Sequence, residues 1–121
     1  MPFIRQVLPT KDATGATQPI TTVPILGKIS GKNIVFVGTG KYLATADLTT
    51  TQRQYAIKDD NAVTPFVNPR PTLVQQTLTN NANGTATRTG STNAVNFYTG
   101  RGWYFDFPDT GERVNIDSKL V

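Results

Sequence analysis

The residues Gly38-Thr39-Gly40-Lys41 have the types that could bind a phosphate group. In a P-loop, backbone N–H groups of a glycine-rich turn surround the phosphates and the lysine neutralises them. That loop requires a glycine five residues before the Gly-Lys pair and a Ser or Thr after the lysine, but Val35 and Tyr42 stand there. The dinucleotide pattern requires a glycine at 43, where the chain has Leu43. We therefore interpret the two glycines as the end of a strand, where glycine permits a bulge or a sharp bend.

Carboxylates occur in two places where they could act together. Asp59-Asp60-Asn61 could offer oxygen ligands to calcium, but no acidic residue follows to close a calcium loop. Asp106 and Asp109 flank a Phe-Pro pair and could face each other across a turn. Glu112 is the only glutamate, so a glycosidase pair has few candidates. We interpret both sets as turn residues, since Asp bonds its own backbone in such positions.

Nucleophilic catalysis lacks its usual partners. The chain contains neither His nor Cys, which excludes Ser-His-Asp and Cys-His arrangements within it and removes the commonest general base, metal ligand and disulfide. Its three serines, Ser30, Ser91 and Ser118, all lie in loop-like sequence. We expect no catalytic, cofactor-binding or metal-binding residue in this chain, and no enzyme activity.

An aromatic run at Trp103-Tyr104-Phe105-Asp106-Phe107 offers a binding surface of another kind. In a strand, residues 103, 105 and 107 share one face. Such a face usually packs between sheets, although it could also stack sugars or bases. Asn83-Gly84-Thr85 matches a glycosylation acceptor and doubles as a hairpin turn.

Charge and hydropathy narrow the possible partners. The net charge is +4, but the basic residues are scattered singly, whereas a nucleic-acid surface needs them clustered. We expect no nucleic-acid partner. No apolar run approaches the ~18 residues of a membrane span, and residues 1–20 do not resemble a signal peptide. For an exported protein, the export signal would then lie outside this chain.

The elements that position these residues are short strands. Composition rich in Val, Ile, Phe, Tyr and Thr, punctuated by Gly, Pro and Asn, is typical of an all-β protein. The longest plausible helix, near residues 42–51, would span about two turns and is interrupted by β-branched threonines. Apolar and alternating segments predict strands over residues 3–8, 18–26, 33–37, 53–58, 73–79, 85–89, 102–107 and 112–116. The most apolar of these, 33–37, is a candidate for burial on both faces.

Several of these segments, taken in order, identify a family. They are Gln18-Pro19-Ile20-Thr21-Thr22, Val35-Phe36-Val37-Gly38-Thr39-Gly40-Lys41-Tyr42-Leu43, Gln54-Tyr55-Ala56-Ile57-Lys58-Asp59-Asp60, Leu73-Val74-Gln75-Gln76, Gly102-Trp103-Tyr104-Phe105-Asp106-Phe107-Pro108 and Gly111-Glu112-Arg113-Val114. The ordered set resembles the PilC-type β-propeller domain of PilY-type proteins, which sit at the tip of bacterial type IV pili. The resemblance covers nearly the whole chain.

The resemblance implies a fold. Residues 1–121 would be one partial propeller domain, the fragment of a larger antiparallel propeller. A full blade would occupy about 18–108, with strands at 18–29, 33–40, 53–59 and 102–108. Residues 3–8 would end the preceding blade and 112–117 would begin the next. The hairpin at 72–90 would be an insertion within the blade.

The resemblance also implies a function. Family members are exported, non-enzymatic proteins that promote pilus assembly, oppose retraction, and contribute to adhesion and surface motility. The implied partners are minor pilins or other pilus components, the rest of the propeller and a host or abiotic surface. The implied location is the bacterial cell envelope or exterior, at the pilus tip or outer membrane. Some members bind calcium through an acidic propeller loop, so calcium is possible in the full-length protein, although no loop here matches.

Two alternatives remain open. Residues 105–112 are similar to the Asp-x-x-Thr-Gly hairpins of quinoprotein dehydrogenase propellers, which use pyrroloquinoline quinone. In those blades a docking tryptophan follows the hairpin, whereas Trp103 precedes it here. The second alternative is a carbohydrate-binding β-sandwich that uses Trp103.

Overall fold

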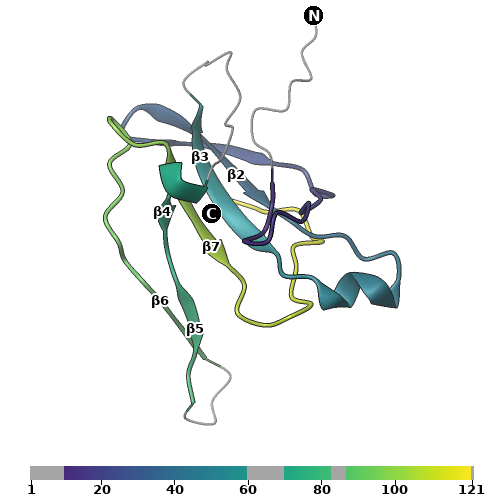
Figure 1. Cartoon of the computed structure of the whole chain (residues 1–121). Coiled ribbons are helices and arrows are strands. Elements are labelled where there is room, and N and C mark those ends of the chain that lie inside the picture. Colours follow the sequence, from purple (N-terminus) through teal and green to yellow (C-terminus); the bar gives the residue numbers. More distant parts are fainter. Residues whose placement is uncertain (1–9, 60–69, 83–86, 121) are drawn as a thin grey trace, which may run out of the picture.

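The protein is a single twisted β-sheet with a projecting hairpin (Figure 1). The computed structural model describes residues 10–59, 70–82 and 87–120. In this described part of the chain, helical structure is limited to two short 3-10 turns, η1 (Thr45–Thr49) and η2 (Arg70–Thr72). Within these described ranges, no helix has the length and apolar character needed to cross a membrane. The all-β prediction is confirmed.

Four antiparallel strands form most of the sheet. They are β1 (Ile25–Ile29), β2 (Lys32–Gly38), β3 (Arg53–Asp59) and β7 (Gly102–Asp106), which pair in this order. The β1–β2 hairpin turns at Ser30-Gly31, where both residues have positive φ, as a tight two-residue turn requires. The pairing of β3 with β7 joins segments far apart in sequence, with Tyr55 opposite Tyr104. This up-and-down arrangement is the four-stranded blade that the resemblance implies.

Alternation along the strands divides the core between the two faces of the sheet. One face, here called the tyrosine face, carries Val37, Tyr55, Ile57 and Tyr104, which pack with Leu73. The other, the tryptophan face, carries Ile34, Phe36, Ala56, Trp103 and Phe105, and Val95 and Phe97 cover part of it. Because Ile34 and Val37 are buried on opposite faces, β2 contributes to both cores, as its apolar sequence predicts.

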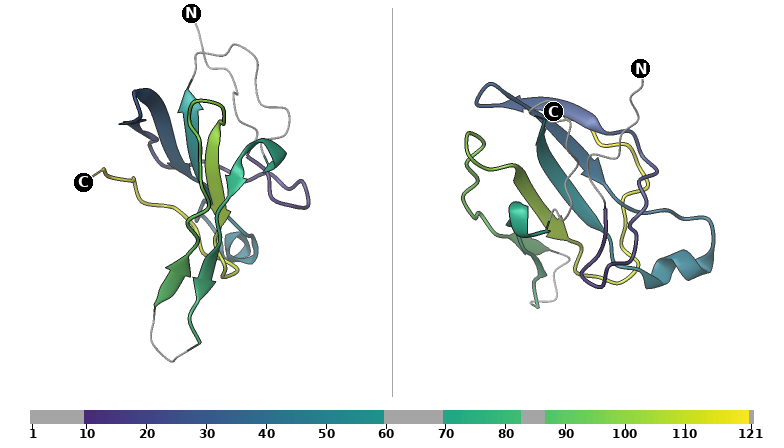
Figure 2. Two further views of the ribbon diagram at one scale, coloured as in Figure 1. Left: turned by 90° about the vertical axis from the view of Figure 1, so that its left-hand side faces the viewer. Right: turned by 45° about the horizontal axis from the view of Figure 1, so that its top comes forward.

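A fifth strand extends the sheet beyond β7. Strand β4 (Val74–Gln75) pairs with β7 in parallel, and Gln76 N donates to Tyr104 O at 2.8 Å. The chain then leaves the sheet as a hairpin of β5 (Leu78–Asn80) and β6 (Arg88–Gly90), which form a separate two-stranded sheet. We call residues 76–82 and 87–93 the arm, and Figure 2 shows that it points away from the blade. The inserted hairpin is thus confirmed. The predicted strand over 73–79 is divided between β4 and β5, and the parallel pairing of β4 with β7 has no counterpart in the sequence analysis.

Two of the predicted strands are wrong in part. Residues 18–24 are not a strand, and β1 begins only at Ile25, because Gln18 and Pro19 bond to loop atoms instead: Gln18 Nε2 donates to Thr51 O and Pro19 O accepts from Gly40 N. Residues 112–117 form no strand either. They cross the end of β2, where Val114 N donates to Thr39 O at 3.0 Å. The predicted strand at 3–8 lies outside the described residues.

Gly102 allows β7 to approach β3. Its φ is +128°, and a Cβ atom at this position would overlap the carbonyl oxygen of Ala56. Glycine is therefore the residue that both the backbone conformation and the available space require.

Substituting Gly102→Ala is expected to lower the free energy of unfolding by more than about 2 kcal/mol, since it adds both a clash with backbone and an unfavourable φ. The measurement is urea unfolding followed by circular dichroism. Gly90→Ala is the matched control, because no atom lies within 4 Å of the place that its new Cβ would occupy, and it should unfold like the unsubstituted chain. Equal effects of the two substitutions would contradict this role of Gly102.

Candidate functional site

A groove opens where the arm leaves the sheet. It has a volume of about 460 Å³. Its apolar floor comes from the tryptophan face and the arm: Leu78, Val95, Phe97, Trp103 and Phe105. Its polar rim comes from the two sides of the arm, here called its legs, which are the outgoing segment with Gln76 and Thr77 and the returning segment with Ser91, Thr92 and Asn93. A concave apolar surface with a few polar groups is the usual form of a ligand site.

Strand β7 supplies the aromatic floor of this groove. Trp103 and Phe105 are nearly parallel, with ring centroids 5.9 Å apart and 11° between planes, and Phe107 meets Phe105 edge-on at 5.3 Å. Residues 103, 105 and 107 therefore share a face, as their spacing predicts. Trp103 packs on the core cluster of Ile34 and Ala56 but stays partly exposed, so it both packs and lines the groove.

The rim is held in shape by a side-chain hydrogen-bond network. Gln76 bridges the two legs of the arm: its Oε1 accepts from Ser91 Oγ at 2.6 Å and from Asn93 N at 2.9 Å, while its Nε2 donates to Asn93 O at 2.7 Å. Asn93 Nδ2 also donates to Gln75 O. The hydroxyls of Thr77 and Thr92 bond to no residue in the described part of the chain, so they are available to a ligand.

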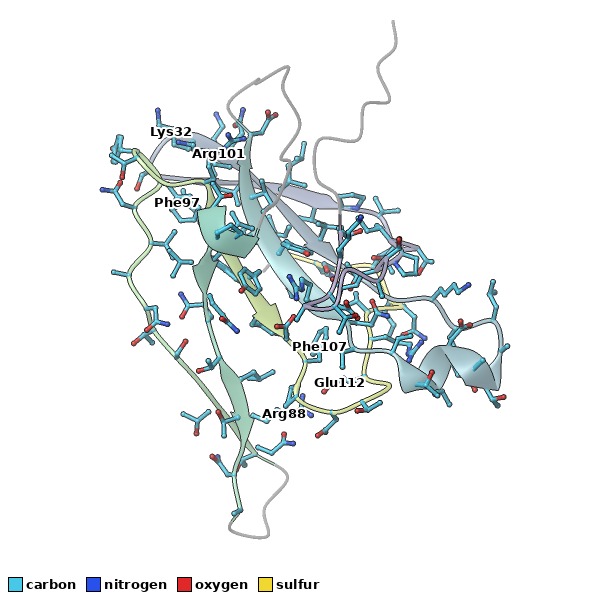
Figure 3. All side chains as sticks on the ribbon, in the orientation of Figure 1. Lys32, Arg88, Phe97, Arg101, Phe107 and Glu112 are labelled. Atoms are coloured by element: carbon cyan, nitrogen blue, oxygen red, sulfur yellow. The ribbon has the colours of Figure 1, made fainter. Side chains whose placement is uncertain are left out.

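A cluster of charges fastens the arm to the loop after β7. Arg88 lies beside Glu112, which it contacts at 2.5 Å (Figure 3). It also contacts Asp109 at 2.9 Å, and its Nε donates to Asn80. Asn80 Nδ2 donates to Asp109 as well. The hydrogen bond and charge of Glu112 raise the pKa of the Arg88 guanidinium above its usual range. This cluster orients the arm relative to the blade.

A second arginine is buried within the tyrosine face. The Arg53 side chain is 1% exposed, contacts Asp106 at 2.5 Å and lies 4.7 Å from the centre of the Tyr104 ring. Asp106 and Asp109 thus bind different arginines and do not form a carboxylate pair. Asp106 ends β7, which corrects its interpretation as a turn residue, whereas Asp109 does lie in the turn.

The Gly38-Thr39-Gly40-Lys41 motif is a strand end. Thr39 N donates to Arg53 O and Gly40 N donates to Pro19 O, so these N–H groups already bond to carbonyls, and Lys41 Nζ lies 3.7 Å from Asp47. Gly40 has φ of +145°, and a Cβ atom at 38 or 40 would overlap the side chain of Val114 or Arg113. The interpretation as a sharp bend is confirmed.

Arg113 fastens the crossing C-terminal segment to this bend. Its guanidinium donates to the carbonyl oxygens of Lys41 and Asp47, and its Nε donates to Gly111 O at 2.7 Å. The Asp47 carboxylate in turn accepts from the backbone N–H groups of Leu43 and Ala44. The bond from Leu43 is the largest cause that holds the pKa of Asp47 below its usual value.

The remaining candidates lie partly outside the described residues. Asp59 is exposed at the end of β3, but Asp60 and Asn61 are not described, and neither are Asn83, Gly84 and Thr85. Within residues 10–59, 70–82 and 87–120, no group of three His, Cys, Asp or Glu side chains could hold a metal ion. The structure thus adds no support for a calcium site in this chain.

Comparison with known proteins identifies the blade. The model of the PilY1 beta-propeller domain family matches residues 5–91, well over half of the chain. This chain belongs to the PilY1 β-propeller domain family. It is also similar to the crystal structure of the Pseudomonas aeruginosa PilY1 C-terminal domain, with a TM-score of 0.71 and 30% sequence identity over 92% of this chain. No curated protein sequence matches the chain.

The PilY1 match shows the family and the propeller fold, but it concerns only part of the matched protein. The chain covers 28% of the P. aeruginosa PilY1 structure, so it spans about a quarter of that propeller-containing chain. The PilY1 family is associated with type IV pili.

Sequence reasoning missed the two arginine contacts and the groove. Arg53 stands at the start of an alternating strand, and this pattern could have indicated that its charged side chain points inward. Asp106 stands at the end of another strand, directly after an aromatic run. No local signal indicates that Arg88 reaches Asp109 and Glu112, since these contacts span 21 and 24 residues. The groove of this chain therefore lies beside an insertion whose position only the folded chain reveals.

Substituting Asp106→Asn is expected to lower the free energy of unfolding by about 2–4 kcal/mol, because it leaves the buried Arg53 charge without its counter-ion. Asp109→Asn makes the same chemical change in an exposed ion pair and should cost about 1 kcal/mol or less. Urea unfolding at neutral pH measures both. A larger effect of Asp109→Asn would refute the assignment of Arg53–Asp106 as the stabilising pair.

Tyr55 is expected to make the folded chain less stable at alkaline pH. Burial, with a smaller contribution from Asp106, raises the pKa of its hydroxyl above the ordinary 10.0. The unfolded chain therefore loses this proton at a lower pH than the folded chain does. The contribution of this proton to the free energy of unfolding is fully present below about pH 10. Above that pH the free energy of unfolding should fall by up to about 1.4 kcal/mol per pH unit.

Tyr55→Phe should remove this alkaline loss and leave stability at pH 7 within about 1 kcal/mol of the original, since the buried hydroxyl has no hydrogen-bond partner among the described residues. Tyr98→Phe alters an exposed tyrosine and should leave the pH dependence unchanged. The check is urea unfolding at a series of pH values between neutral and strongly alkaline. An unchanged alkaline slope in Tyr55→Phe would overturn the explanation.

Proposed function

We propose that this chain is part of a non-enzymatic type IV pilus protein that promotes pilus assembly and contributes to adhesion and motility. Its partners would be the remaining propeller blades and minor pilins or other pilus components. It would act at the pilus tip or outer surface of a bacterial cell. Its exposed loops would contact a host or abiotic surface. The match of the PilY1 family model to residues 5–91 is the observation that carries this proposal.

The architecture of the chain supports a role in assembly. A blade buries its faces against neighbouring blades, and the apolar side chains of Leu26 and Ile116 are 70% and 77% exposed here. The arm and its groove add a surface that a blade does not need for packing. A structural scaffold with a projecting surface fits an adhesive assembly protein.

The composition supports a non-enzymatic role. The chain lacks His and Cys, and its carboxylates Asp106, Asp109 and Glu112 bind arginines. The quinoprotein alternative requires a docking tryptophan after the 105–112 hairpin, where the chain has none. Adding pyrroloquinoline quinone and calcium to the full-length protein should therefore produce no cofactor absorbance.

Deleting residues 10–120 from the encoding gene is expected to reduce the number of surface pili and the attachment of cells. The measurement is electron microscopy of pili together with an attachment assay. Complementation with the intact gene should restore both, and complementation with Gly102→Ala, which disrupts the blade, should not. Normal piliation and attachment in the deletion strain would contradict the proposed function.

A further inference from the structure

We propose that the groove between the arm and the tryptophan face binds a neutral glycan. The inference deepens the proposed adhesive function by naming the class of ligand, and it rests on that function for its biological meaning. The binding itself is measured on purified protein, whereas the proposed function is measured by pili on cells. The two can therefore fail separately.

The composition of the groove favours a neutral polyhydroxy ligand. None of its lining residues is charged, although 20 of the 121 residues of the chain are, from 12 basic and 8 acidic side chains. The nearby guanidinium of Arg88 is already paired with Asp109 and Glu112 in the cluster that holds the arm. Phosphates, nucleic acids and acidic peptides would meet no counter-charge on this surface.

The geometry of the groove provides the two contacts that a sugar ring needs. The partly exposed Trp103 and Phe105 present an apolar aromatic floor against which the C–H groups of a sugar can pack. The hydroxyls of Thr77 and Thr92 can each donate and accept hydrogen bonds at the rim. A volume of about 460 Å³ lies in the range of small-molecule sites.

The rim is organised before a ligand arrives. Gln76 joins the legs of the arm through Ser91 and Asn93, and Arg88 fastens the arm to the loop after β7. The position of the threonine hydroxyls above the aromatic floor is therefore set by the fold. Such preorganisation lowers the entropy cost of binding.

The groove lies beside the edge of the sheet that is opposite β1. It flanks β7, and the arm projects from this same edge (Figure 2). Blade sheets radiate from a central axis, so their inner edges crowd together. We therefore place this edge and its arm at the periphery of the propeller, where the groove can stay open while the rest of the tryptophan face packs against a neighbouring blade.

The test begins with an array of neutral and charged glycans, probed with the purified 121-residue chain. The array includes animal-type glycoprotein glycans and fragments of bacterial polysaccharides, which separates these two sources. Hits are then titrated against the fluorescence of Trp103, the only tryptophan in the chain. We expect neutral glycans to bind and to change this fluorescence, and sulfated or sialylated ones not to. Binding confined to charged glycans, or no binding at all, would overturn the proposal.

Variants locate the site by saturation-transfer NMR with the best neutral glycan. Thr92→Val removes an exposed rim hydroxyl with little change in shape and should weaken binding several-fold. Trp103→Ala should weaken it by about tenfold or more. Tyr98→Ala removes an exposed aromatic ring outside the groove and should bind normally.

Thr92→Val keeps the test decisive if Trp103→Ala unfolds, because Thr92 is exposed and outside both core clusters. Unchanged binding in Thr92→Val and in a folded Trp103→Ala would place the glycan elsewhere and overturn the proposal. A longer protein that includes the neighbouring blades should bind the same glycans. Loss of binding in that protein would show that the groove is covered, and this too would overturn the proposal.

Discussion

The pairing of β3 with β7 is the constraint on which the rest of the structure depends. It joins segments separated by the long connection 60–101, and backbone bonds continue it beyond both strands, from Lys58 N to Arg101 O and from Phe107 N to Gln52 O. One end requires Gly102, which has no side chain to meet the Ala56 carbonyl, and the other is closed by the ion pair of the buried Arg53 with the partly exposed Asp106. Closing so long a connection costs chain entropy, which the two apolar cores must offset.

The same pairing creates the candidate site. Once β7 lies beside β3, alternation places Trp103 and Phe105 on one face and Tyr104 on the other. The connection 60–101 must then return to the edge of β7, and β4 pairs there in parallel before the chain leaves as the arm. The groove exists because the arm departs over the tryptophan face and leaves the two rings partly uncovered. Its structural role and its proposed binding role thus come from the same residues.

Three arginine side chains in this protein hold distant segments of the chain together. Arg53 bonds within the sheet, Arg88 fastens the arm, and Arg113 fastens the C-terminal segment to the bend after β2. Each joins segments that are distant in sequence. The planar guanidinium group suits this use, because it can bond to several oxygen atoms at once. This use of arginine also leaves the groove without charge, which is the property that favours a neutral ligand.

The amino-acid sequence by itself determined the all-β class, the strands β2, β3 and β7, the strand-end bend at Gly38-Thr39-Gly40 and the shared face of Trp103, Phe105 and Phe107. These follow from local alternation and turn residues, which act over a few positions. Only the tertiary structure decided the parallel strand β4, the arginine contacts, the groove and the path of 112–117. Each of these depends on which distant segments meet, and 112–117 fails to form a strand because its backbone bonds to the bend instead. Local patterns indicate where strands form. The long-range pairing of β3 with β7 decides where β4, the arm and the groove lie.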